Sequence, residues 1–285
     1  MKLEELLYKQ EIQDIRAFNK DVIEAIEEIV EKYHQSMYAT DTARGLVNIA
    51  INTKNKDAVI ESLKTIEKYE GRNALGISYN TWCIVNGLGD IAESTKDKDR
   101  IIKTAKIMSL DEIVDSAKNK TYIDKLVKIA AYTEDKDAVI ESLKIIEKYE
   151  GDNTWTIIDD TWRIEYGLGT IAEGTKNKDA VIESLKTIEK YEGKSVWGIT
   201  YGLGDIAVIT KDPNIIIKTA KIMSLDEIVD SAKNKTYIDK LVKIAAYTED
   251  KDAVIESAKI IGKYEGRGAW NIANGLGSIA IVPNA

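Results

Sequence analysis

Few residues of this chain could do chemistry. The sequence holds one histidine, His34, and one cysteine, Cys83, so no Cys/His metal cluster can form within it. The densest carboxylate group outside repeated strings is Asp152, Asp159 and Asp160. Acid–base or metal chemistry needs further ligands or an imidazole at fixed geometry. We therefore expect a solvated acidic loop, a Cys83 that only packs, and no catalytic residue, metal or cofactor.

A Gly-Leu-Gly motif recurs five residues after a tryptophan. A phosphate-binding loop would need a preceding strand and a helix N-terminus aimed at the anion, and the sequence predicts neither. Glycines two apart in an apolar helix allow a bulky neighbour, expected to be tryptophan, to lie against bare backbone. The tryptophans could instead form an aromatic ladder for peptides, but their identity in every copy favours core packing. They are Trp82, Trp162, Trp197 and Trp270.

The elements that position these residues are copies of a helical unit. Residues 101–142 and 216–257 are the same string, and 53–71 and 175–193 also match without a difference. An acidic residue or asparagine opens each KDAVIES-like run and is interpreted as a helix N-cap. These residues are Asp21, Asp57, Asp99, Asp137, Asp179, Asn214 and Asp252. After KYE the runs end at glycines suited to a left-handed turn, at Gly71, Gly151, Gly193 and Gly266.

A second kind of apolar run, such as Trp82 to Ala92, precedes each capping residue and has two apolar faces. We call it the first helix of a unit and the KDAVIES-like run the second helix. Stacked hairpins of this length bury a continuous core. The sequence therefore predicts an all-α, right-handed α-solenoid of about seven stacked helical hairpins plus a final helix. The expected single array, 1–285, comprises a capping hairpin (1–36), repeats (37–266) and a C-terminal helix (267–285).

By unit length and helix pairing the whole chain resembles the HEAT-like and armadillo class of α-solenoids. The resemblance is architectural, because the first helices carry Gly-Leu-Gly where HEAT units usually have proline. It implies a non-catalytic scaffold that binds a protein or peptide. Some HEAT-like proteins act on nucleic acid or on bilin chromophores, so such an enzyme is the alternative. A structural protein that self-associates through its last helix is a third possibility.

The composition of the chain limits which classes of binding partner we expect. The net charge is −8 and charges of both signs are interleaved, which argues against a nucleic-acid footprint. The first residues lack the apolar core of a secretory signal, and no stretch of 18 apolar residues occurs. We expect a cytoplasmic protein with a protein or peptide partner, no nucleic acid and no membrane, as a monomer or with weak self-association.

Comparison of the first helices shows where the copies vary. The variable positions are those of Cys83, Asn86 and Asp90, and they lie at i, i+3 and i+7 on one stripe. We hypothesise that this stripe faces a ligand, although unconstrained exposed positions would also drift. Trp155 and Tyr79 are added because they lie in the two long connections that precede Trp162 and Trp82. The predicted binding residues are Tyr166, Tyr201, Asn86, Asn274, Arg163, Asn271, Trp155 and Tyr79.

Overall fold

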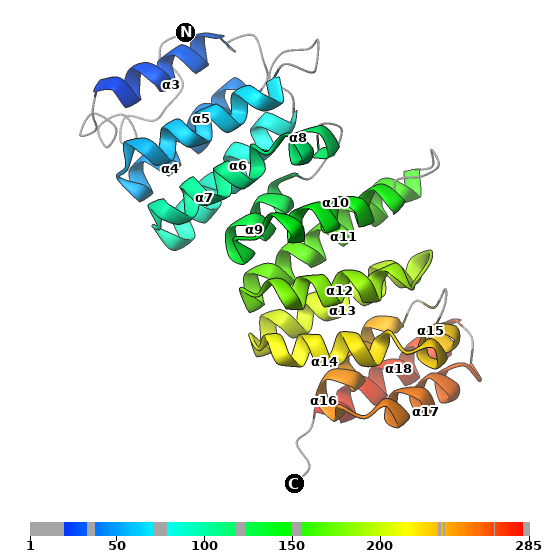
Figure 1. Ribbon diagram of the computed structural model, residues 1–285. Helices are drawn as coiled ribbons and strands as arrows, with labels where there is room; N and C mark the ends of the chain where they lie inside the picture. Colours follow the sequence, from blue (N-terminus) through cyan, green and yellow to red (C-terminus); the bar gives the residue numbers. More distant parts are fainter. Residues whose placement is uncertain are drawn as a thin grey trace. The chain divides into compact units, whose positions relative to one another are not determined.

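Helices account for all the regular structure in the part of the chain that the computed structural model describes (Figure 1). The predicted all-α class is therefore confirmed for this part of the chain. The described residues are 20–32, 38–70, 79–117, 123–149, 155–232, 235, 237–264 and 266–281. Two predicted C-terminal glycines, Gly71 and Gly151, lie outside them, as do His34 and Asp152.

The chain divides into two compact units, Met1–Leu143 and Lys144–Ala285. Unit 1 contains α3 (Lys20–Lys32), α4 (Ala39–Thr53), α5 (Lys56–Glu70), α6 (Tyr79–Thr95), α7 (Lys98–Met108), α8 (Asp111–Ala117) and α9 (Ile123–Thr133). The division falls within α10 (Lys136–Tyr149). Unit 2 contains α11 (Trp155–Thr175), α12 (Lys178–Glu189), α13 (Lys194–Thr210), α14 (Pro213–Met223), α15 (Asp226–Ala232), α16 (Ile238–Thr248), α17 (Lys251–Ile261) and α18 (Gly266–Ile281).

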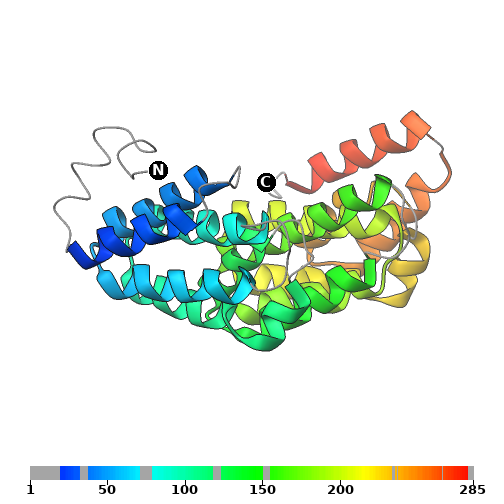
Figure 2. The same cartoon turned by 90° about the horizontal axis from the view of Figure 1, so that it is seen from above.

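Each unit has two layers of helices, which can be followed in Figures 1 and 2. In unit 1 the first helices α4, α6 and α9 pack in sequence, and α5 packs on α7. In unit 2 the first helices α11, α13, α16 and α18 pack in sequence, and α12 packs on α14. Every first helix of both units except α18 carries a leucine with no exposed surface, at Leu46, Leu88, Leu126, Leu168, Leu203 and Leu241. Burial of one such side chain stabilises the fold by about 1.5–3 kcal/mol.

The repeated strings fold alike, but they contain an element that the hairpin prediction missed. Helices α7, α8 and α9 have the same bounds as α14, α15 and α16, displaced by the offset of the strings. The missed element is the short helix α8 and its copy α15. In α15 the apolar residues Ile228, Val229 and Ala232 are buried, and Ala232 lies about one helical turn after the other two. Copies with this sequence therefore consist of three helices, not two.

The N-caps of the second helices lie two residues before the predicted ones. Asp97 Oδ1 accepts hydrogen bonds from the backbone N–H groups of Asp99 (3.0 Å) and Arg100 (3.1 Å). The same role falls to Asn55, Asp135, Asn177, Asp212 and Asp250. The prediction was wrong because both positions of these linkers carry suitable acceptors. The residues predicted as caps lie in the first turn, where a carboxylate still interacts favourably with the helix dipole.

Left-handed backbone occurs at other places than predicted. It lies where the first helices end, at φ of 49–53°, on Lys54, Lys96, Glu134, Lys176, Lys211 and Glu249. Gly193 (φ 56°) and Gly266 (φ 54°) do adopt positive φ. They lie at the start of α13 and α18, however, and the preceding helices end at Glu189 and Ile261. These glycines turn the chain into the next first helix instead of capping the helix before them.

The tyrosine of the KYE string ties neighbouring second-layer elements together. Tyr69 Oη donates to the carbonyl of Met108 (2.9 Å), and Tyr191 Oη donates to that of Met223 (2.6 Å). Tyr149 Oη donates to the carbonyl of Tyr191 (2.7 Å). Met108 and Met223 end their helices, so their carbonyls have no partner within the helix. Burial raises the pKa of Tyr69 and Tyr191 well above the ordinary value, and that of Tyr149 to about 12.

The substitution Tyr191→Phe should lower the free energy of unfolding by about 1–2 kcal/mol at neutral pH, because the buried Met223 carbonyl loses its donor. The folded-state pKa of Tyr191 is raised, so its stabilising effect is complete below the ordinary value of 10.0 and is lost as the pH rises further. The difference between the two proteins should therefore shrink above pH 10. Denaturant unfolding at several pH values measures it.

Tyr264→Phe is the matched control, because Tyr264 belongs to the KYE copy after α17 and its side chain is 51% exposed. It should leave the free energy of unfolding unchanged. An equal loss in both variants would contradict the assigned role of the Tyr191 hydroxyl.

Candidate functional site

Adjacent first helices touch through bare backbone. A Cβ atom on Gly167 of α11 would lie 2.4 Å from Thr200 Cγ2 and 2.8 Å from the Thr200 carbonyl oxygen of α13. A Cβ on Gly204 of α13 would lie 3.5 Å from the Gly167 carbonyl oxygen. Gly45 of α4 meets Val85 of α6 in the same way. The packing interpretation of the glycines therefore holds, but their neighbours are β-branched side chains and backbone, not tryptophan.

The tryptophans of the first helices are not core residues, contrary to the prediction. Trp82, Trp162 and Trp197 are half-buried, and Trp270 is 49% exposed. Because the glycines bring the helix backbones together, an indole ring has no room between them and lies at the edge of the contact. In unit 1 the Trp82 ring stacks on Tyr38, with centroids 5.5 Å apart.

In unit 2 the aromatic side chains at this edge form two equivalent pairs, one on each of two adjacent helices. The rings of Trp162 and Tyr166 are 5.6 Å apart on α11, and those of Trp197 and Tyr201 are 5.7 Å apart on α13. The guanidinium of Arg163 lies 4.5 Å from the centroid of the Trp197 ring, so it joins the two helices. This geometry is that of a cation–π contact.

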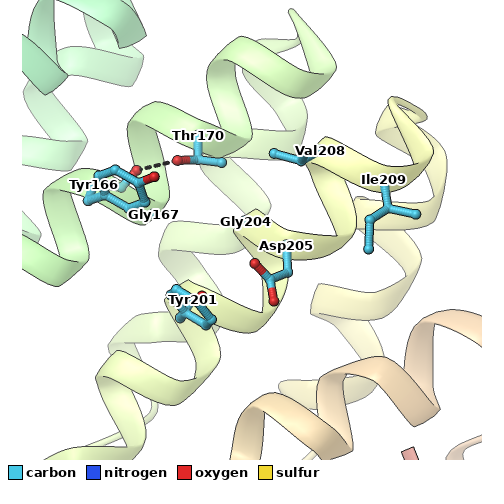
Figure 3. Close-up of a pocket in the computed structure, with 8 residues that line it drawn as sticks. All are labelled: Tyr166, Gly167, Thr170, Tyr201, Gly204, Asp205, Val208 and Ile209. Atoms are coloured by element: carbon cyan, nitrogen blue, oxygen red, sulfur yellow. Dashed lines mark hydrogen bonds between the residues drawn. The ribbon is translucent and has the colours of Figure 1, made fainter. Parts of the chain in front are cut away.

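A pocket of about 340 Å³ lies between α11 and α13 beside these pairs (Figure 3). Tyr166 and Tyr201, at equivalent positions of the two helices, are 43% and 41% exposed. Gly167 and Gly204 line the pocket with bare backbone. The remaining lining residues are Thr170, Asp205, Val208 and Ile209. The pocket thus combines two aromatic side chains, an apolar end and one carboxylate.

The polar groups of the pocket have defined partners. Thr170 Oγ1 donates to the Tyr166 carbonyl at 2.7 Å, within α11 (Figure 3). Asp205 Oδ2 lies 3.7 Å from Lys243 Nζ of α16, which is longer than the 2.7–2.9 Å typical of a charge-assisted hydrogen bond. The Asp205 side chain is 35% exposed. The carboxylate is therefore loosely paired and accessible to a ligand.

The structure brings together part of the predicted stripe. Tyr166 and Tyr201 line the pocket, and Arg163 lies beside it on Trp197. The position of Arg163 does not continue as an exposed row, because its equivalents Cys83 and Gly198 are buried. A Cβ on Gly198 would lie 3.2 Å from Ile238 Cβ. Variation at this position therefore follows helix packing, and the expectation of an exposed position was wrong there.

The other predicted residues whose side chains the structure describes do not line the pocket. Asn86 is half-buried on α6 of unit 1, while Asn271 is exposed and Asn274 half-buried on α18. Trp155 and Tyr79 are the first residues of α11 and α6, so they belong to helices and not to connections; their side chains lie outside those described. No glycine or proline interrupts 155–166, and Trp155, Ile158 and Trp162 have helical spacing, which explains the longer helix.

Two pocket residues, Val208 and Ile209, were missed by the sequence comparison. They are 54% and 60% exposed and occupy the places that Glu173 and Gly174 hold in α11. The sequence signal for them is weak, because the Trp270 copy also has apolar residues at these two positions, Ile281 and Val282, and only the Trp82 and Trp162 copies have polar or small ones. The predicted stripe ended at the position of Asp205, one helical turn before them.

Comparisons of the chain with protein-family models, curated proteins and solved structures give no match. Within the described ranges, no three His, Cys, Asp or Glu residues are grouped so that they could hold a metal ion. Likewise, no described helix is both long enough and apolar enough to cross a membrane.

Gly167→Ala should lower the free energy of unfolding by about 1–3 kcal/mol, because the new methyl group overlaps the Thr200 backbone and forces α11 and α13 apart. Gly275→Ala on α18 is the matched control, since nothing described lies within 4 Å of its Cβ position. The control should gain up to about 1 kcal/mol from helix propensity. Urea unfolding of both variants measures these changes; equal stabilisation of both would contradict the close backbone contact.

Proposed function

We propose that the protein is a non-catalytic binding module that holds a segment of another protein, or a peptide, on the α11–α13 face of unit 2. The observation that carries the proposal is the pocket formed by Tyr166 and Tyr201. The pocket lies at positions where the copies of the repeat differ in sequence, on helices whose other positions agree between copies. The α-solenoid repeats of the wider HEAT-like class also bind partners along such helix faces.

The chemistry of the pocket suits a protein segment. Tyrosine offers a large apolar ring and a polar tip while losing little side-chain entropy, and it is enriched at the centres of protein interfaces. Both rings are already held by tryptophan neighbours, so little ordering is needed on binding. The exposed Val208 and Ile209 extend the contact surface to one side.

The finer architecture belongs to the same proposal. We infer a right-handed, HEAT-like solenoid of stacked hairpins, located in the cytoplasm. The regular packing of first helices on first helices within each unit supports it, as does the identical capping of the second helices. Tyr69 and Tyr191 donate to equivalent carbonyls, so the contact from one repeat to the next is the same in both units.

The experiment is selection of peptides from a random twelve-residue display library on the immobilised full-length protein. Selected peptides should lose affinity by roughly 30-fold or more when Tyr166 and Tyr201 are both replaced by alanine, because central interface tyrosines contribute about 2 kcal/mol or more. Both side chains are partly exposed, so the variant should keep its circular dichroism spectrum and unfolding midpoint. Fluorescence anisotropy with labelled peptides measures the affinity.

Asn86→Ala is the matched control, since Asn86 of α6 in unit 1 holds the position that Tyr201 holds in α13. It should leave the affinity unchanged. Failure to enrich any peptide above background would overturn the proposed function. So would equal affinity of the selected peptides for the wild type and the double alanine variant.

A further inference from the structure

We infer that the Tyr166–Tyr201 pocket recognises a basic side chain of its ligand, with arginine preferred, flanked by an apolar residue. This inference deepens the proposed function and rests on it. Four features of unit 2 support it: the equivalent positions of the two tyrosines on adjacent helices, a cation already held by the same helices, the accessible carboxylate and the apolar end of the pocket.

The spacing of the rings follows from the glycine contact. Packed helices lie about 8–10 Å apart, and contact through bare glycine backbone favours the lower end of this range. Because Tyr166 and Tyr201 are at equivalent positions, their side chains leave adjacent helices at a similar separation. A cation placed between two such rings lies within about 6 Å of each centroid, the limit for a cation–π contact. Tyrosines at this helix separation can therefore flank one planar guanidinium group.

The molecule itself holds an arginine against one aromatic ring of this edge, one helical turn earlier. Arg163 of α11 extends over the Trp197 ring of α13 at 4.5 Å. Tyr166 follows Arg163 by three residues, and Tyr201 follows Trp197 by four. The aromatic edge of the α11–α13 contact is thus shown to accept a guanidinium group. A ligand arginine in the pocket would continue the same row of alternating rings and cations.

The carboxylate of Asp205 provides the matching charge. It lines the pocket, is partly exposed, and lies 3.7 Å from Lys243 Nζ, so a ligand guanidinium can approach it more closely than the lysine does. Arginine suits the pocket better than lysine because its planar head both stacks on rings and donates two hydrogen bonds to one carboxylate. The negative net charge of the chain, −8, favours approach of a basic ligand.

The apolar end of the pocket specifies the neighbouring residue. Val208 lies three residues and Ile209 four residues after Asp205, so both follow it along the same side of α13. Their side chains are more than half exposed. An aliphatic residue next to the arginine would cover them while the arginine lies between the rings.

The probe is the acetylated and amidated hexapeptide Ala-Ala-Arg-Leu-Ala-Ala, compared with forms in which citrulline, lysine or norleucine replaces arginine. Citrulline keeps the shape of arginine without its charge. Titrations follow the backbone amide resonances of Gly204 and Asp205 by NMR with the full-length protein. The arginine peptide should bind at least about tenfold more tightly than the citrulline peptide, with the lysine peptide between them.

Variants of the pocket charges should change this preference in opposite directions. Asp205→Asn should weaken binding of the arginine peptide by about five- to tenfold and leave the citrulline peptide unaffected. Lys243→Gln should tighten binding of the arginine peptide by about two- to fivefold, because it removes the competing cation. Asp90→Asn and Lys128→Gln are the matched controls, since these residues hold the same positions in unit 1 without the tyrosine pair; they should change nothing.

The outcomes separate this inference from the proposed function. Equal binding of the arginine and citrulline peptides, or equal losses in Asp205→Asn and Asp90→Asn, would overturn the preference for a basic residue. The proposed function would survive that result if library peptides without a basic residue still depend on Tyr166 and Tyr201. Absence of binding by both the library and the hexapeptides would overturn the two together.

Discussion

The close contact between neighbouring first helices is the constraint on which the remaining structure depends. Glycine at the contact lets the Gly167 and Thr200 backbones approach until no methyl group fits between them. This approach excludes the large side chains of the same helices from the interface. The tryptophans consequently lie at its edge, where they support the tyrosines that line the pocket. Packing and site therefore have one origin, the absence of a side chain at a few positions.

The second layer secures the same stacking by different means. Its helices are joined through tyrosine hydroxyls and the free carbonyls at helix ends, as in the Tyr191–Met223 pair. These bonds use side chains that are the same in several copies, so they hold the framework without distinguishing one unit from the next. Positions outside both contacts, such as Tyr201 and Val208, can then change without cost to the fold. That separation is what allows a repeated scaffold to carry a single site.

Much of this could be predicted from the sequence, because helical period and repetition act over short distances. The all-α class, both kinds of helix and the Tyr166/Tyr201 stripe were predicted from such patterns. The N-caps were placed two residues late, since Asp97 and Asp99 are equally good acceptors and only the geometry of the turn selects one. The exposure of Trp270 could not be predicted, because burial of an indole depends on the distance between helices and not on its own helix. The pocket itself depends on the same distance.

The identity of the two long strings has a consequence for how the chain reaches this fold. The helices α5 and α12, which accept α7 and α14, come from strings that are themselves identical, and α7 differs from α14 only in its first three residues. Each acceptor can therefore take either donor, and discrimination depends largely on chain length. The wrong donor for α5 lies about four times farther along the chain, which disfavours it by only about 1.2 kcal/mol of closure entropy. During synthesis this ambiguity does not arise, because α7 can dock before the second string has left the ribosome. Refolding of the complete chain from denaturant lacks that order and is exposed to misassembly of the twin segments.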